Sequence, residues 1–291
     1  MYYFLYGFLW LISLLPLPVL YLVSDFFYVL VFYVFKYRRA IVMNNLAIAF
    51  PAKTIAERTG IAKRFYRNFI DSFIETIKLF SASKRFVEKR SSSNFEIFDD
   101  LARKGYSVNI MAGHQFNWEL GNLLYALHLK VPFVGIYMPI TNKVLDRIFI
   151  NLRKRYGTIL ISAKDFKSKV HTIFNQQHCF GLAADQNPGD PSNSYWLDFF
   201  GKPVPWVTGP SKGAVKNNAA VVFVAMKKIK RGYYHFAPTL LVERASEHTP
   251  QELTKLYKEV LEKTIRENPD NYLWSHRRWK WTWKEEYGTK Y

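Results

Sequence analysis

The chain has 291 residues, a net charge of +18 at neutral pH and a hydrophobic content of 49%. Its aromatic content of 18% excludes an intrinsically disordered chain, and its length suffices for one large domain or two small ones. Cys179 is the single cysteine, which excludes a disulfide framework and a multi-cysteine zinc cluster. So basic a chain is expected to bind a polyanion: nucleic acid, an anionic membrane surface or a phosphorylated substrate.

The N-terminal stretch favours a membrane among these partners. Residues 1–35 carry one formal charge, on Asp25, and the run is long enough to cross the hydrocarbon core of a bilayer. Pro16 and Pro18 interrupt it, which predicts one kinked span or a span whose second half lies at the interface. A buried helical hairpin is the alternative interpretation of the same residues.

Basic residues directly after this stretch predict its orientation. Positive charge at the end of a span favours the cytoplasmic side, and Lys36, Arg38 and Arg39 provide such charge. The expected organisation is therefore a membrane-anchoring segment over residues 1–39, followed by a cytoplasmic domain over residues 40–291.

The rest of the chain alternates between helical and strand patterns. Helices are predicted over residues 54–80, 95–103, 117–127, 142–156, 165–176, 208–217 and 251–268. Strands are predicted over residues 107–112, 133–137, 158–162, 179–184, 219–226 and 233–236, and residues 91–94 are interpreted as a polar break. Strands that alternate with helices indicate an α/β fold, with a mixed, mainly parallel sheet flanked by helices.

Polar clusters follow two of the predicted strands, where α/β proteins place their functional groups. His114 comes just after the strand over residues 107–112, Glu119 falls about a turn into the next helix, and Asp185 follows another strand. Glu119 can reach one imidazole nitrogen from that position, fix its tautomer and make His114 a general base for a hydroxyl. Because a histidine followed by an acid also occurs by chance, a capping or core role for His114 stays open on these features alone.

The segment GHQFNWE, residues 113–119, resembles the H-x4-D/E signature of glycerolipid acyltransferases. The chain is especially similar to the late acyltransferases of lipid A biosynthesis, the lauroyl/myristoyl transferase family. Beyond the hydrophobic N-terminus, matching segments follow in the same order along the chain: RKR at 153–155, AKDFK at 163–167, ADQ at 184–186, FFG at 199–201, TG at 208–209 and YLWSHRRWK at 272–280.

The resemblance implies an O-acyltransferase with a glycerolipid acyltransferase-like fold. The donor would be a fatty acyl thioester of acyl-carrier protein, or acyl-CoA, and the acceptor a hydroxyl of a lipid A precursor or a related anionic glycolipid or phospholipid. His114 would be the base and Glu119 its partner. Arg153 would bind the acceptor's phosphate or the thioester oxyanion, and Asp185 would orient Arg153. The resemblance implies no metal and no cofactor, and a place at the bacterial inner membrane with the catalytic domain on the cytoplasmic face.

Two alternatives stay open at this stage. The acceptor could be a different lipid, such as an aminoacyl or glycosyl lipid, because paralogous acyltransferases share the dyad. From a different class, the basic and aromatic surface could belong to a membrane-tethered RNA-binding module, whose binding would weaken steeply with salt and survive loss of His114. No recognisable RNA-binding motif supports this second reading, so no nucleic-acid partner is expected.

Three further features are interpreted without a catalytic role. The tail over residues 274–283 carries four tryptophans among basic residues, which fits either the headgroup layer of a membrane or an aromatic core edge with stacked guanidinium groups. The basic residues within 227–231 are expected to form a solvated hairpin tip. Cys179 lies in the middle of a predicted strand, so it is interpreted as a small core residue that forms no acyl thioester.

Overall fold

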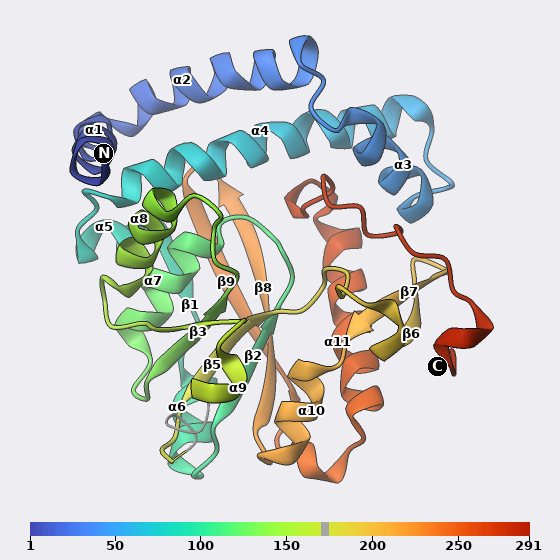
Figure 1. Ribbon diagram of the computed structural model, residues 1–291. Coiled ribbons are helices and arrows are strands. Elements are labelled where there is room, and N and C mark those ends of the chain that lie inside the picture. Colours follow the sequence, from blue (N-terminus) through green and yellow to red (C-terminus); the bar gives the residue numbers. More distant parts are fainter. Residues whose placement is uncertain (170–174) are drawn as a thin grey trace.

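The computed structural model describes residues 1–169 and 175–291 and centres on a seven-stranded sheet (Figure 1). The strand order is β1-β9-β8-β2-β5-β3-β4, and neighbours pair in parallel except β8 and β9, which form an antiparallel hairpin. The strands are β1 (Ser91–Ser93), β2 (Val108–Ala112), β3 (Phe133–Tyr137), β4 (Ile159–Ser162), β5 (Cys179–Ala183), β8 (Ala220–Lys230) and β9 (Tyr233–Val242).

Helices cover both faces of this sheet. Ile110 of β2 packs among side chains of α7 and α8 on one face, and its neighbour Met111 packs among those of α10 and α11 on the other. The helices that follow the N-terminal region are α3 (Arg39–Ala49), α4 (Ile55–Leu79), α5 (Lys84–Arg90), α6 (Glu96–Arg103), α7 (Trp118–His128), α8 (Lys143–Lys154), α9 (Phe166–Lys169), α10 (Gly209–Lys216) and α11 (Pro250–Glu267). The predicted α/β class with a mainly parallel sheet is confirmed.

The local sequence explains the two elements that position the site. All residues of β2 are buried, as expected of a central strand covered on both faces. Helix α7 begins after Asn117, whose side-chain oxygen accepts a hydrogen bond from the backbone N–H of Leu120 and caps the helix. The short loop over residues 113–117 therefore connects the carboxyl end of β2 to the start of α7.

Several elements differ from their prediction. Residues 91–93, interpreted as part of a polar break, form strand β1 and pair with β9; this interpretation was wrong because backbone hydrogen bonds hold the edge strand and its side chains need not be apolar. Helix α3 was not predicted. Of the helix predicted over residues 165–176, the described part contains α9, and residues 170–174 lie outside the described residues.

A second, two-stranded sheet was also not predicted. Strands β6 (Ser194–Phe199) and β7 (Lys202–Val207) form an antiparallel hairpin. Its two turn residues, Phe200 and Gly201, have positive φ values of 52° and 73°, the geometry that a tight two-residue hairpin turn requires. The available sequence signal for this hairpin was the aromatic pair Phe199 and Phe200, followed directly by Gly201.

The N-terminal region forms two helices that lie beside α4 (Figure 1). Helix α1 (Tyr2–Leu14) ends before Pro16, and α2 (Leu17–Val29) continues into a π-helical turn, η1 (Leu30–Val34). The 18 residues from Leu17 to Val34 have a mean hydropathy of 1.9, so by length and composition this helix could cross a membrane.

The C-terminal tail contributes to the core. Trp274 is fully buried, and the buried guanidinium of Arg278 stacks on Trp206 of β7, with 4.4 Å between the guanidinium carbon and the ring centroid. The aromatic core edge, one of the two readings of the tail, is therefore correct for these residues.

The basic hairpin tip is not the solvated face that was expected. Lys228 and Arg231 both bind Asp71 of α4, whose side chain is only 3% exposed. The expectation was wrong for these two residues because the burial of Asp71 depends on how α2 and α4 pack together, which the sequence around the tip does not reveal.

Candidate active site

The position of His114 depends on a close approach between β2 and α11. A Cβ atom on Gly113 would lie 2.5 Å from Cδ1 of Leu261, so any other residue here would require the Leu261 side chain of α11 to shift. His114 follows directly. Its side chain is 24% exposed and lines a cavity at the carboxyl ends of the strands.

Asp185 is the carboxylate that contacts His114. Nδ1 of the imidazole lies 2.6 Å from Oδ1 of Asp185, and the backbone N–H of His114 donates to both carboxylate oxygens at 3.1 Å. The sheet register explains this meeting: Ala112 of β2 is paired with Ala183 of β5, so the residues two positions further on each strand come together. A carboxylate only accepts, so Nδ1 carries the proton and Nε2 is the free base.

Burial and charge act in opposite directions on this pair. Burial opposes the charged imidazolium, but the charge of Asp185 and its hydrogen bond outweigh it, and the pKa of His114 is raised above its ordinary value of 6.5. Burial alone would raise the pKa of Asp185, but the imidazole and the backbone N–H groups lower it. Asp185 is thus an ionised, buried carboxylate held by His114.

Glu119 contacts a different side chain. Its carboxylate accepts from Nε of Arg153 at 2.9 Å and from Nη2 at 2.5 Å, and from the indole N–H of Trp118 at 3.2 Å. Both side chains of the ion pair are largely buried, at 6% and 20% exposed. Burial opposes the charge of Arg153, but Glu119 outweighs it and raises the pKa of the guanidinium. A bidentate pair of this kind fixes the plane of the arginine.

The structure thus brings the four predicted site residues together with a different pairing. The sequence assigned Glu119 to His114 and Asp185 to Arg153, whereas the observed pairs are Asp185 with His114 and Glu119 with Arg153. His114, Glu119 and Arg153 line one cavity, and Asp185 lies buried behind His114.

This cavity has a volume of about 930 Å³ and is mostly apolar. Its lining includes two glycines on neighbouring strands, Gly135 of β3 and Gly181 of β5, which are paired in register. A Cβ on Gly181 would lie 2.9 Å from Cζ of Phe133, so the phenyl ring occupies the space that a side chain would take. Such a shape suits a long apolar ligand.

The tail supplies site contacts that the sequence did not reveal. The backbone N–H of Leu273 donates to the carbonyl oxygen of His114 at 3.0 Å, and burial together with the nearby charge of Asp185 raises the pKa of the Tyr272 phenol. Arg278 donates to the side chain of Asn187, which lines the cavity. The family motif over residues 272–280 was the available sequence signal for this segment, but it did not indicate which side chains the segment contacts.

Two further sources of catalytic chemistry are a cysteine thiol and a cluster of metal-binding side chains. Burial raises the pKa of the Cys179 thiol to about 12, so the residue is a thiol rather than a thiolate at neutral pH. Within residues 1–169 and 175–291, no group of three His, Cys, Asp or Glu side chains is arranged to hold a metal ion.

Comparisons with known proteins identify the family of the chain. The family model described as bacterial lipid A biosynthesis acyltransferase matches residues 1–281. The lipid A biosynthesis lauroyltransferase of Escherichia coli K12 is 24% identical over 276 residues, covering 94% of this chain and 89% of the relative. The palmitoleoyltransferase of the same organism is 25% identical over 279 residues, with the same coverage. A lipid A biosynthesis acyltransferase of Haemophilus influenzae is 24% identical over 84% of this chain and 78% of its own. The chain belongs to the bacterial lipid A biosynthesis acyltransferases.

Proposed function

We propose that the protein transfers a fatty acyl chain from acyl-carrier protein to a hydroxyl of a lipid A precursor, with His114 as the general base. The contact between Nδ1 of His114 and Asp185 carries the proposal. Because Nδ1 is held by a buried carboxylate, the imidazole edge with Nε2 is the one that serves the cavity. A neutral imidazole so oriented accepts a proton from a hydroxyl.

The proposed step balances as a direct acyl transfer. Nε2 of His114 takes the proton of the acceptor hydroxyl while the oxygen attacks the thioester carbonyl carbon. The tetrahedral intermediate then collapses, the carbon–sulfur bond breaks, and the leaving thiolate takes the proton back from the imidazolium. Asp185 stabilises the transient imidazolium and keeps the tautomer productive. No covalent acyl-enzyme is needed.

Arg153 is the proposed stabiliser of the developing oxyanion. Among the described residues that line the cavity it is the one cation from Lys or Arg, and Glu119 fixes its guanidinium. Backbone donors beside His114 are already engaged: its own N–H binds Asp185, and that of Gln115 binds the carbonyl of Gly113. Loss of an oxyanion donor typically costs about 10²–10³ in rate.

We further propose that the apolar cavity accommodates the acyl chain and that the catalytic domain lies on the cytoplasmic face of the inner membrane. Apolar side chains such as Leu160, Phe180 and Leu182 line the same cavity as His114. Lys36, Arg38 and Arg39 support the cytoplasmic orientation. A carrier-protein donor is available on that side, and the net charge of +18 favours an acidic carrier.

The test is acyl transfer by purified protein to a lipid A precursor, detected by mass spectrometry as a gain of one acyl chain. The His114→Ala variant should lose about 10²–10⁴ in rate. His128→Ala is the matched control, because His128 ends the same helix α7 and lies outside the cavity lining. Transfer by His114→Ala within a few-fold of wild type would overturn the proposal. The same acyl chain presented on coenzyme A, with a lower kcat/KM expected, tests the donor.

A further inference from the structure

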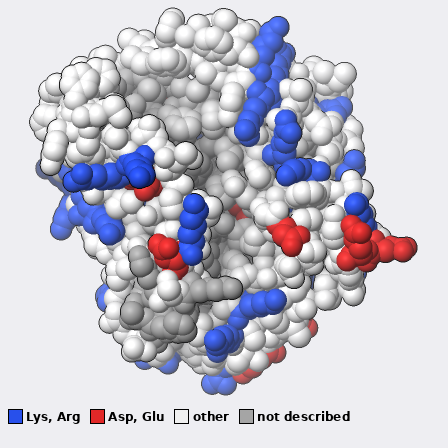
Figure 2. All heavy atoms as spheres, in the orientation of Figure 1, with Lys and Arg blue, Asp and Glu red and all other residues white. Residues whose placement is uncertain are grey.

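The N-terminal helices present a broad apolar face to the outside. Figure 2 shows that the surface over α1 and α2, uppermost in the view, is almost free of charged side chains, and that Lys and Arg side chains lie beside its right-hand end. The large exposed hydrophobic residues within residues 1–35 are Met1, Tyr3, Phe4, Phe8, Trp10, Leu11, Leu14, Leu15, Val19, Leu22, Val23, Phe26, Phe27, Val29, Tyr33, Val34 and Phe35. A contiguous apolar surface of this size marks an interaction site.

The opposite side of α2 is already used by the protein itself. Its buried positions recur every three or four residues, from Leu17 and Leu20 through Ser24 and Tyr28 to Phe32 in η1. The apolar ones among them, Leu17, Leu20, Tyr28 and Phe32, belong to the main hydrophobic core together with residues of α4. Helix α2 therefore lies along the domain, with one stripe on α4 and the other facing outward.

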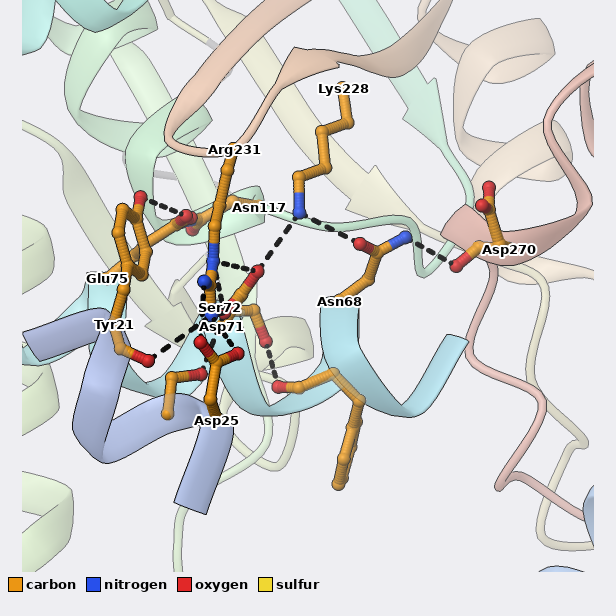
Figure 3. A network of polar contacts seen from close by, with 12 residues as sticks. Tyr21, Asp25, Asn68, Asp71, Ser72, Glu75, Asn117, Lys228, Arg231 and Asp270 are labelled. Atoms are coloured by element: carbon orange, nitrogen blue, oxygen red, sulfur yellow. Dashed lines mark hydrogen bonds and ion pairs between the residues drawn. The ribbon is translucent and has the colours of Figure 1, made fainter. Parts of the chain in front are cut away.

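Ion pairs attach the middle of α2 to the domain (Figure 3). Arg231, at the tip of the β8–β9 hairpin, binds Asp25 of α2 at 2.8 Å and Asp71 of α4 at 2.6 Å. The hydroxyl of Ser24 donates to the same Asp71 carboxylate at 2.7 Å. Asp71 is buried, so removing these partners would leave a buried charge with fewer compensating contacts.

Further polar contacts hold the region along its length. Near the start of α2, the hydroxyl of Tyr21 donates to Glu75 of α4 at 2.9 Å. Between α1 and α2, the ammonium of Lys78 donates to the carbonyl oxygens of Ser13 at 2.7 Å and Leu15 at 3.0 Å. A helix that crossed the bilayer away from the domain would lose all of these contacts.

The dimensions also disfavour a crossing. Helix α1 has 13 residues and is about 20 Å long, whereas the hydrocarbon core is about 30 Å thick. The 18-residue stretch from Leu17 to Val34 has Asp25 at its centre, which a crossing would place at the bilayer midplane, where a carboxylate is most costly.

We propose that α1, α2 and η1 form an in-plane anchor: they lie in the interface of a bilayer, with the outer face in lipid and no residue crossing to the far side. The occupant of the outer face is a lipid surface with anionic headgroups. Tyr3 and Tyr33 on this face suit the headgroup layer, and Lys36 and Arg38 at its end suit anionic lipids. The choice of lipid also rests on the proposed function, whose acceptor is a membrane lipid.

The anchor is connected to the active-site loop by two hydrogen bonds. Glu75 accepts from Tyr21 of the anchor and, at 3.0 Å, from the side chain of Asn117, which caps α7. The in-plane position thus fixes the height of the catalytic loop relative to the lipid surface, so an acceptor could reach His114 while its acyl chains remain in the bilayer.

The test is the accessibility of two engineered cysteines in a Cys179→Ala chain. One cysteine is carried on a short polar extension before Met1, ahead of the start of α1, where it lies in water in either arrangement; the other is Ala52→Cys, at an exposed position after α3. The variants are reconstituted into phosphatidylethanolamine–phosphatidylglycerol vesicles and labelled with a membrane-impermeant maleimide before and after detergent. An in-plane anchor gives equal labelled fractions at the two positions whatever the orientation of the protein. A crossing helix gives complementary fractions, which would overturn the proposal.

A charge on the outer face tests the lipid occupant. Leu22→Glu, at a position 71% exposed, should reduce co-flotation with these vesicles at least ten-fold, whereas Leu240→Glu on β9, 38% exposed, should leave it unchanged. An unchanged Leu22→Glu, or failure of the wild type to float, would overturn the proposal; a change of molecular mass would then identify a second copy as the occupant. Labelling and flotation need no catalysis, so His114→Ala should behave as wild type in both, which separates this proposal from the proposed function.

Discussion

Nδ1 of His114 lies 2.6 Å from Oδ1 of Asp185, although the two residues are 71 positions apart in the chain. The pairing of β2 with β5 brings them together, and Asp185 also accepts the backbone N–H of His114. The carboxylate therefore sets both the tautomer of the imidazole and the position of the main chain that carries it. This dual contact makes Asp185 the residue on which the orientation of the base depends.

The first prediction concerns the acid limb of the pH–rate profile. Transfer requires neutral His114, so activity should fall as the pH drops through its raised pKa, above 6.5. Asp185→Asn removes the charge that raises this pKa, so the limb should move to lower pH while the plateau rate falls by up to about 10⁴ through loss of the productive tautomer. The measurement is kcat/KM against pH for both proteins. A limb that stays in place would contradict the assigned contact.

The second prediction separates Glu119 from the base. Because Glu119 binds Arg153, Glu119→Gln should lower the rate without moving the acid limb. Arg153→Lys should be damaging, since an ammonium cannot replace a bidentate guanidinium, and Lys154→Ala on the same helix is the matched control. The Glu119→Gln/Arg153→Lys double variant should be little worse than Arg153→Lys. A shifted acid limb in Glu119→Gln would instead return Glu119 to the imidazole.

The third prediction concerns acyl-chain length. Phe133→Ala removes the ring that covers Gly181 and lengthens the apolar cavity, so the preferred chain should become longer. Gly135→Val adds atoms close to Leu160 and should shorten it, because the Cβ alone would lie 3.1 Å from Cδ2 of that leucine. The measurement is the distribution of product masses after competition between donors of different length. Selectivity should change about ten-fold or more per methylene. Phe73→Leu, at an exposed position, should leave the distribution unchanged.

The fourth prediction concerns stability and the buried Glu75. Burial raises its pKa above 4.5 in the folded protein, so folding favours the protonated carboxyl. The resulting stability is present below pH 4.5 and is lost as the pH rises through the folded value. Glu75→Gln removes the ionisable carboxyl group. The free energy of unfolding of the variant should therefore rise relative to that of wild type as the pH increases, by at most about 1.4 kcal/mol per pH unit. Paired melting curves across pH measure the difference, and parallel curves would refute it.

The sequence alone predicted correctly the edge of the sheet at which the site lies, but not which carboxylate contacts His114. Apolar runs that end in polar clusters predicted that His114 and Asp185 emerge at the same edge. Which carboxylate reaches the imidazole depends on the register that pairs Ala112 with Ala183, and no local pattern encodes this register. The five-residue spacing to Glu119 was a nearer candidate in sequence, but in the fold that side chain pairs with Arg153.

The remaining differences have the same origin. Lys228 and Arg231 are charged residues at a hairpin tip, and only the packing of α2 on α4 turns their partner Asp71 into a buried group. The strand over residues 91–93 is held by main-chain bonds that leave no side-chain pattern. The β6–β7 hairpin did leave a signal, the aromatic run before Phe200 and Gly201.

The contact between the tail and the catalytic loop has a consequence for biosynthesis. The backbone N–H of Leu273 binds the carbonyl of His114, although Leu273 is synthesised 159 residues after the loop that it holds (273 − 114). A nascent chain that already displays β2, β5 and the N-terminal helices thus lacks this contact. This contact can form only once residue 273 has left the ribosome, so a chain cut short before residue 272 would reach the membrane without it.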